Sequence, residues 1–349
     1  MEKLPKKVRI ECFVELGKHI SQLLEETSKT SNGIYESVFF NAHNQNTWFS
    51  RESVLRAFKG IEKFLDAKVL KEWLDHYTFN ENTAPKIIGT VMAGNIPMVG
   101  FHDMLSILLS GNILKAKLSS ADTYLMKYLA SQIIKNEPRF EQYILFAENL
   151  KEIDALIATG SDNTARHFDY YFRDKPRIIR RNRTACAVLK GDESTEALEA
   201  LAKDVFYYYG LGCRNVTKLY VPSNYAFEPM LKVFETLGKQ AMNNHKYANN
   251  YDYNKSILLV NGIPHLDNGY LLLKEDESLF SAISTLYYER YEQIEDVEKL
   301  LHAKKEQVQC IVSENGSFPN SVAFGYAQAP EITDYADGID TMEFLSRLK

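Results

Sequence analysis

Short apolar runs alternate with amphipathic stretches along this chain from residue 86 onward. Residues 87–93 (IIGTVMA) predict a buried strand, and residues 93–97 predict a turn. We expect an amphipathic helix over residues 98–109 and a second strand over residues 113–118. Together these segments predict a unit of two parallel strands joined by a helix.

The same alternation continues through the rest of the chain. After the first unit we expect a helix at 122–135, strands at 142–147 and 154–159, and a helix at 163–172. Beyond residue 183 the pattern begins again, with strands expected at 185–189, 216–221, 256–260, 270–273 and 308–312 and helices at 194–209 and 227–243. This order favours α/β architecture, with mainly parallel sheets flanked by helices.

The start of the chain differs, because apolar residues recur there at helical spacing over residues 10–25 and 50–74. A chain of 349 residues suits two closely packed lobes of ordinary size. We therefore expect one lobe over residues 1–184, which includes the N-terminal helices, and a second over residues 185–349.

Composition narrows the setting and the partners. Hydrophobic residues make up 45% of the chain, as in soluble globular proteins, and a net charge of -5 without any Lys/Arg-rich run argues against nucleic acid as a partner. No apolar run reaches membrane-spanning length and the N-terminus lacks the apolar core of a secretion signal, so we expect a cytoplasmic protein. The four cysteines lack C-x-x-C spacing, so neither a disulfide framework nor a metal site is predicted.

Cys213 is the candidate nucleophile. It follows a Gly-x-Gly turn at the end of a predicted helix, and Arg214 comes directly after it. A cysteine on a constrained turn beside a guanidinium favours the thiolate form. The alternative is an inert, buried cysteine, which is the better interpretation of Cys12, Cys186 and Cys310.

Three turns at predicted strand ends carry polar residues, and ligands of open α/β sheets bind at the carboxyl ends of strands. Asn95 could donate a hydrogen bond to a developing oxyanion, or simply cap the next helix. The Gly160-Ser161 turn precedes a helix and suits a phosphate, although many such turns bind no ligand. Lys117 could reach a ribose or phosphate oxygen, or lie solvated at its strand end.

Four segments carry a resemblance to a known family. They are residues 91–103 (VMAGNIPMVGFHD), 117–120 (KLSS), 210–222 (GLGCRNVTKLYVP) and 334–344 (DYADGIDTMEF). In their order and spacing they resemble the acyl-CoA reductase family typified by the fatty acid reductase of bacterial bioluminescence, a branch of the aldehyde dehydrogenase superfamily. The resemblance covers most of the chain from residue 86 to residue 349.

The resemblance implies an aldehyde-dehydrogenase-like fold with a cofactor lobe, a catalytic lobe and a cleft between them. By position, Cys213 is similar to the catalytic thiol and Asn95 to the oxyanion donor. Lys117 resembles the lysine that contacts the adenine ribose, with Ser119 assigned to the same cofactor site. The Gly160-Ser161 turn resembles the one beside the dinucleotide phosphates.

Two departures from the wider superfamily refine this expectation. Aldehyde-oxidising members carry a glutamate that activates water, and the corresponding stretch here, residues 178–183 (IIRRNR), contains no carboxylate. Its loss would protect an S-acyl enzyme from hydrolysis. NAD-preferring relatives often place a glutamate three positions after the lysine, where this chain has Ser120, so NADPH is the expected cofactor and NADH stays open.

The expected reaction is reduction of a long-chain fatty acyl-CoA to an aldehyde and coenzyme A, through an acyl group on Cys213. The resemblance also implies a possible partner enzyme that supplies the acyl group or consumes the aldehyde. A homo-oligomer is a further possibility that the resemblance implies. The alternatives are a CoA-acylating aldehyde dehydrogenase, a cysteine acyltransferase or thioesterase, and a non-enzymatic dinucleotide-binding protein.

Overall fold

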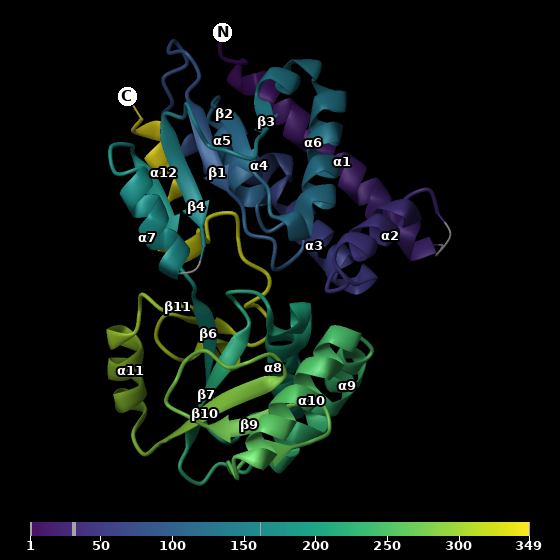
Figure 1. Ribbon diagram of the computed structural model, residues 1–349, viewed down its shortest axis with the longest axis vertical. Coiled ribbons are helices and arrows are strands. Elements are labelled where there is room, and N and C mark those ends of the chain that lie inside the picture. The colour runs from purple at the N-terminus through teal and green to yellow at the C-terminus, as the bar shows by residue number, and fades with distance from the viewer. Residues whose placement is uncertain (1, 30–32, 161, 349) are drawn as a thin grey trace. The chain divides into compact units, whose positions relative to one another are not determined.

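Two sheets, one in each of two units, organise the computed structural model (Figure 1). The structure describes residues 2–29, 33–160 and 162–348. Unit 1 comprises Met1–Arg181 and Glu331–Lys349, and unit 2 comprises Asn182–Pro330. Both units have the expected α/β architecture.

The sheet of unit 1 has the strand order β3-β2-β1-β4-β5, and every neighbouring pair is parallel. Its strands are β1 (Ile87–Val91), β2 (Ile113–Lys117), β3 (Ile144–Phe146), β4 (Ala155–Thr159) and β5 (Arg177–Arg180). Strand β1 is buried at its three central residues and β4 at its first four, as expected for a sheet covered on both faces. The chain builds outward from β1 in one direction and then continues from β4 in the other, so the order reverses between β1 and β4.

Helices cover this sheet, with α1 and α6 together on one side and α7 on the other (Figure 1). The helices of unit 1 are α1 (Lys6–Lys29), α2 (Glu36–Gln45), α3 (Arg51–Phe64), α4 (Ala67–Asp75), α5 (Phe101–Leu109), α6 (Thr123–Asn136), α7 (Asp162–Tyr171) and α12 (Thr341–Ser346), with 3₁₀ turns η1 (Ser120–Asp122), η2 (Pro138–Gln142) and η5 (Ala336–Gly338). The helical region expected over residues 50–74 is divided at Asp66, whose side chain caps α4 by accepting hydrogen bonds from the backbone N–H groups of Lys68 and Val69.

The C-terminal tail belongs to unit 1, which differs from the expected division at residue 184. The hydroxyl of Tyr335 lies 2.7 Å from the indole nitrogen of Trp73 and 2.7 Å from the hydroxyl of Tyr77. The Tyr77 hydroxyl in turn donates to Asp340 at 2.7 Å. These polar contacts join segments more than 250 residues apart, so local sequence patterns do not predict them.

The sheet of unit 2 has the order β12-β11-β6-β7-β10-β9-β8 and is parallel except for the edge pair of β8 with β9. Its strands are β6 (Thr184–Val188), β7 (Val216–Pro222), β8 (Leu266–Asp267), β9 (Leu272–Glu275), β10 (Thr285–Tyr291), β11 (Val308–Ser313) and β12 (Ser321–Ala323). The helices are α8 (Thr195–Phe206), α9 (Glu228–Met242), α10 (His245–Val260) and α11 (Ile294–Ala303), with 3₁₀ turns η3 (Tyr207–Gly210) and η4 (Glu314–Gly316). Figure 1 shows α9 and α10 on one side of this sheet and α11 on the other.

The strand expected at residues 256–260 is wrong, because this segment is the last part of α10. Asn244 caps that helix, its side chain accepting from the backbone N–H groups of Lys246 and Tyr247. Of the apolar run, Leu258 is buried while Val260 is 87% exposed. The run therefore lacks the two-sided burial of a central strand.

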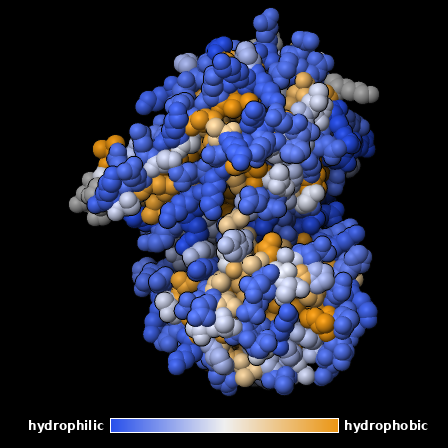
Figure 2. Space-filling view, turned by 180° about the vertical axis from the view of Figure 1, so that it is seen from behind, coloured by the Kyte–Doolittle hydropathy of each residue, from blue (hydrophilic) through white to orange (hydrophobic). Residues whose placement is uncertain are grey.

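The visible face of each unit is mostly hydrophilic, with apolar residues scattered over it (Figure 2). Among the described residues, no helix combines the length and the apolar character needed to cross a membrane.

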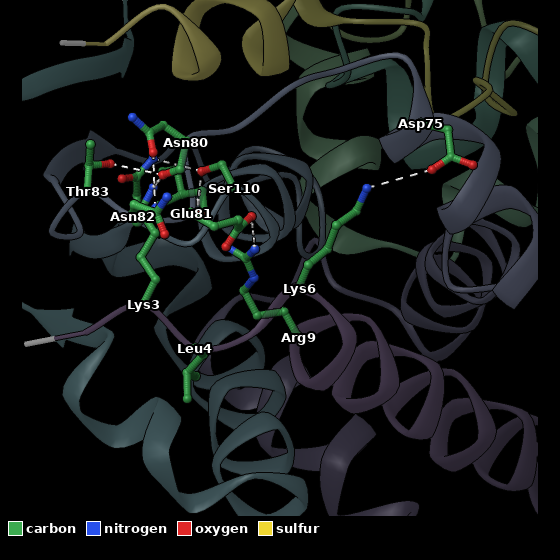
Figure 3. A network of polar contacts seen from close by, with 12 residues as sticks. Lys3, Leu4, Lys6, Arg9, Asp75, Asn80, Glu81, Asn82, Thr83 and Ser110 are labelled. Atoms are coloured by element: carbon green, nitrogen blue, oxygen red, sulfur yellow. Dashed lines mark hydrogen bonds and ion pairs between the residues drawn. The ribbon is translucent and has the colours of Figure 1, made fainter.

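A buried cation holds the N-terminal helix against the rest of unit 1 (Figure 3). The side chain of Arg9 is fully buried and pairs with Glu81 at 2.5 Å. The Nζ of Lys3 donates to the carbonyl oxygen of Asn80, 2.8 Å away, in the same loop. Gly111 packs directly against the guanidinium, since a Cβ built there would lie 1.9 Å from Arg9 Nη1. Gly111 also has a φ of +79°, a conformation that L-residues disfavour.

We predict that Gly111→Ala lowers the free energy of unfolding by about 2 kcal/mol or more, because the methyl group meets the buried guanidinium and the left-handed backbone is strained. Gly60→Ala is the matched control. Gly60 lies within α3 with no atom within 4 Å of a built Cβ. That change should stabilise the chain by about 0.5–1 kcal/mol. Urea unfolding of both variants measures the difference, and equal effects would contradict the packing argument.

Candidate functional site

Three of the predicted site residues come together at one edge of the unit 1 sheet. Because β1, β2 and β4 are parallel, the loops that follow them leave from the same carboxyl edge. Asn95 is exposed in the loop after β1, Lys117 is the exposed last residue of β2, and Gly160 follows β4 directly. This edge includes the point between β1 and β4 where the strand order reverses, which is where open α/β sheets bind ligands.

The loop after β1 packs closely on the loop after β2. A Cβ built on Gly94 would lie 2.4 Å from the Ser119 hydroxyl oxygen, so only glycine allows this approach. The Ser119 side chain is half-buried and accepts a hydrogen bond from the backbone N–H of Ala121 at 3.3 Å. In this structure Ser119 therefore caps η1, whereas its neighbour Ser120 is exposed.

Asp122 also links these two loops, and sequence reasoning missed it. It is 1% exposed, and its Oδ2 accepts from the backbone N–H of Met98 at 2.6 Å. Met98 has a φ of +56°, which is unusual for a residue other than glycine. The buried Oδ1 has no hydrogen-bond partner. Burial raises the pKa of Asp122 to about 8, while the Met98 N–H works in the opposite direction.

The residues at this edge fit a dinucleotide. Lys117 offers an exposed ammonium and Ser120 an exposed hydroxyl, both suited to ribose and phosphate oxygens. The N–H of Gly160 donates to the carbonyl oxygen of Arg180, 3.2 Å away, so it continues the sheet pairing. Donors for a phosphate would come instead from the first turn of α7. Ser161, the other residue predicted at this turn, lies outside the described residues.

Cys213 lies in unit 2, on the turn between η3 and β7. It is the exposed cysteine, whereas Cys12, Cys186 and Cys310 are buried. Burial raises the pKa of Cys12 and of Cys186 to about 12, which keeps both as thiols at neutral pH. The structure thus separates the predicted nucleophile from the cysteines predicted to be inert.

Asn215 fixes the turn that carries Cys213. Its side chain is fully buried, and its Nδ2 donates to the carbonyl oxygens of Asp204, Val205 and Tyr207 at 3.0, 3.2 and 2.7 Å. Its Oδ1 accepts from the backbone N–H of Gly212 at 2.8 Å. One amide therefore caps the C-terminus of α8 and closes the turn, as carbonyls at a helix end require.

The backbone just before this turn is strained. Tyr208, Tyr209 and Gly210 have φ values of +54°, +59° and +79° in succession. The sequence suggested a Gly-x-Gly turn directly after a helix, but α8 ends at Phe206 and the left-handed residues follow it. Left-handed tyrosines are rare, and such strain gathers at functional sites.

The first half of the stretch expected to lack a water-activating carboxylate, residues 178–180, belongs to strand β5, which the sequence did not predict. Arg180 is buried and pairs with Asp103 at 2.7 Å, and its second nitrogen donates to the hydroxyl of Thr341. The Asp337 carboxylate accepts from the backbone N–H of Arg181 at 3.2 Å. The carboxylates of Asp103 and Asp337 are thus already engaged within unit 1.

Over the part of the chain that the structure describes, no group of three or more His, Cys, Asp or Glu side chains is arranged to hold a metal ion.

Comparison with known proteins gives a family and a fold. The family model described as Acyl-CoA reductase (LuxC) matches residues 14–257, which is more than half of the chain. A search of curated proteins found no match.

Solved structures of aldehyde dehydrogenases share the fold. Aldehyde dehydrogenase 21 from Physcomitrella patens, in complex with the product succinate, is 12% identical, with a TM-score of 0.67 over 98% of this chain and 84% of that one. A Mycobacterium tuberculosis aldehyde dehydrogenase complexed with NAD+ is 13% identical, with a TM-score of 0.61 over 89% and 73%. A putative aldehyde dehydrogenase from Anabaena variabilis is 14% identical, with a TM-score of 0.60 over 91% and 81%. The aldehyde-dehydrogenase-like fold expected from the sequence is confirmed.

We predict that Asp122 makes stability depend on pH. Its pKa is raised from 3.8 to about 8, so its contribution to stability is full below about pH 4 and is lost as the pH rises through 8. The melting temperature of the native chain should therefore fall relative to that of Asp122→Asn between pH 5 and pH 8.5. Thermal denaturation of both proteins across this range measures the difference. A constant difference would show that Asp122 does not titrate in this window.

Proposed function

Because the chain belongs to the acyl-CoA reductase family, we propose that it reduces a long-chain fatty acyl-CoA to the aldehyde and coenzyme A, with NADPH as reductant. Members of that family are NAD(P)-dependent oxidoreductases, so acyl reduction is the type of reaction the chain performs. The observation that carries the finer proposal is Cys213, an exposed cysteine on a turn held by the buried hydrogen bonds of Asn215.

The first half of the reaction transfers the acyl group to the protein. The Cys213 thiolate attacks the carbonyl carbon of the thioester, a new carbon–sulfur bond forms, and coenzyme A leaves as a thiolate that takes up a proton. Arg214, the next residue, favours the charged form of the thiol. The rigid turn presents the sulfur without any reordering of the backbone.

The oxyanion of this step needs hydrogen-bond donors. We assign this role to the side-chain amide of Asn95 and the backbone N–H of Cys213. Asn95 is exposed at the carboxyl edge of the unit 1 sheet, and its loop is fixed by Gly94 and by the contact of Met98 with Asp122. A donor that is already in place stabilises the developing charge without the cost of reorganisation.

The second half reduces the acyl group. When bound, the nicotinamide dinucleotide supplies the hydride that converts the thioester on Cys213 to a hemithioacetal. Lys117, Ser119 and the turn at Gly160, with the backbone N–H groups of the first turn of α7 as phosphate donors, would hold that dinucleotide. This hemithioacetal, formed as its alkoxide, would then collapse: the oxygen lone pair reforms the carbonyl, the carbon–sulfur bond breaks, the aldehyde leaves and the Cys213 thiolate is restored.

The stretch at residues 178–183 favours reduction over hydrolysis. It contains no carboxylate, and two carboxylates that contact it, Asp103 and Asp337, are bound to Arg180 and to the backbone of Arg181. A thioester without a nearby general base reacts slowly with water. The acyl group therefore persists on Cys213 until the hydride arrives.

The remaining expectations concern partners. The substrate would come from an enzyme that forms or transfers acyl groups, and the aldehyde would go to one that consumes it. A homo-oligomer stays a prediction. The CoA-acylating direction and a purely acyl-transferring or hydrolysing activity are the alternatives that the first experiment below separates.

Incubation with palmitoyl-CoA, a long-chain probe, should add the mass of one acyl group to the intact protein, and NADPH should then remove it with release of aldehyde. Cys213→Ala should abolish both the adduct and the aldehyde, while Cys310→Ala, at a buried position, should keep both. Intact-protein mass spectrometry measures the adduct. An adduct that NADPH does not remove would indicate acyl transfer or hydrolysis. Formation of aldehyde by Cys213→Ala would contradict the proposal that Cys213 is the nucleophile.

Asn95→Ala should lower kcat about 10²-fold, the usual effect of removing one oxyanion donor. Alkylation of Cys213 by iodoacetamide should stay unchanged, because that reaction develops no oxyanion. Steady-state aldehyde formation measures the loss. An unchanged kcat would leave Asn95 an ordinary residue of the turn after β1, since Gly100 and not Asn95 is the N-cap of the following helix.

Ser120→Glu should shift the cofactor preference from NADPH toward NADH by about tenfold or more, because a carboxylate beside the ribose repels a 2′-phosphate. The ratio of kcat/KM values for the two cofactors measures this shift. Ser131→Glu, at an exposed position on α6, is the control and should leave the ratio as it is. If Ser120→Glu and the native chain had the same ratio of kcat/KM values, the ribose that carries the 2′-phosphate would not bind beside residue 120.

A further inference from the structure

A second buried carboxylate lies beneath the turn that carries Cys213. Asp204, in the last turn of α8, is fully buried. Its Oδ2 accepts from the backbone N–H of Gly325 at 2.6 Å and its Oδ1 from that of Ala327 at 3.1 Å. Both oxygens are thus bound to one short segment more than 120 residues away in the chain.

Small residues allow this segment to lie against α8. Gly325 has a φ of +86°, and a Cβ built on it would lie 3.2 Å from the Cβ of Ala200. Phe324 and Ala327 on either side are buried. The segment at residues 325–327 is therefore held by packing as well as by the Asp204 carboxylate.

The contacts continue from this segment to the nucleophile turn. The carbonyl oxygen of Ala327 accepts from Nη1 of Arg214 at 3.5 Å. Arg214 is followed by Asn215, whose Nδ2 donates to the main-chain carbonyl oxygen of Asp204 at 3.0 Å. The contacts thus close a ring that starts and ends at Asp204 and contains the residues on the C-terminal side of Cys213.

We propose that Asp204 is a positioning residue for Cys213. Its carboxylate holds the backbone N–H of Ala327, and the carbonyl oxygen of Ala327 in turn accepts from the guanidinium of Arg214, the residue that follows the nucleophile in the sequence. This inference rests on the proposed role of Cys213. Asp204 touches neither substrate nor cofactor in this account, and it acts only through Arg214. Its consequence is that the charge which favours the Cys213 thiolate stays in one place.

The cost of burying Asp204 supports such a role. Burial raises its pKa to about 7, although the N–H groups of Gly325 and Ala327 and the charge of Lys203 stabilise the carboxylate. A carboxylate is an expensive acceptor for two backbone N–H groups in a protein interior. It is, however, one of the few side chains that can accept from both at once.

Alkylation of Cys213 by iodoacetamide, followed by mass spectrometry from pH 5.5 to pH 9, tests this inference without any acyl-CoA. Asp204→Asn keeps the volume but places an amide N–H₂ against one of the two backbone donors. We expect alkylation at pH 7 to be about tenfold slower than in the native chain and its pH midpoint to move upward, because less of the thiol is ionised. Glu199→Gln, at an exposed position on the same helix, should leave rate and midpoint unchanged.

Arg214→Gln removes the last link of the ring and should reproduce the change, and the double variant with Asp204→Asn should show no further one. Should Asp204→Asn not fold, Gly325→Ala displaces the same segment from its other side and should slow alkylation likewise. A purely structural Asp204 would lower the melting temperature and leave the midpoint in place.

A native pH profile in folded Asp204→Asn, or in Arg214→Gln, overturns the inference. Failure of the proposed function gives a different result: Cys213 of the native chain alkylates and depends on Asp204 as described, but palmitoyl-CoA yields neither adduct nor aldehyde.

Discussion

Parallel pairing of β1 with β2 and β4 is the constraint on which the arrangement of unit 1 depends. Parallel strands need a crossover after each strand, so every loop that follows one of these strands leaves from the same edge. Asn95, Lys117 and Gly160 are far apart in the sequence and yet share that edge. In unit 2, the parallel pairing of β6 with β7 fixes the strand that begins three residues after Cys213, which gives the nucleophile turn a rigid base.

Much of this architecture follows from local sequence patterns, and its exceptions have physical causes. The strands that flank the turns of interest are short runs rich in apolar and β-branched residues, which the sequence identifies well. Residues 256–260 have the same texture but extend a capped helix, because tertiary packing buries only part of the run. Strand β5 was missed since Arg177 and Arg180 frame only two apolar residues. Arg180 can be buried there because Asp103 and Thr341, both distant in sequence, satisfy it.

The candidate site divides in a similar way. The sequence identified Cys213, Asn95 and Lys117, and the structure finds all three exposed. It gave no sign of the buried polar residues Asp122 and Asn215. A single carboxylate or amide in a sequence is indistinguishable from a surface residue. Such a side chain is stable in the interior only when a backbone group, often distant in the sequence, forms a hydrogen bond with it. For Asp122 that partner is the backbone N–H of Met98, 24 residues away. Met98 has a left-handed backbone conformation, which the sequence does not predict for a methionine.

The buried amide and the strained backbone beside Cys213 are best understood together. Two left-handed tyrosines cost about 1 kcal/mol or more each, and they persist only where the surroundings outweigh that cost. Asn215 does so, because its buried side-chain amide donates to carbonyls at the end of α8, two of these hydrogen bonds being buried. Relaxing the tyrosines would break those bonds, so the chain cannot withdraw the turn into the interior. Cys213 therefore stays exposed on its turn, whereas the other cysteines lie within packed strands and a helix and are buried.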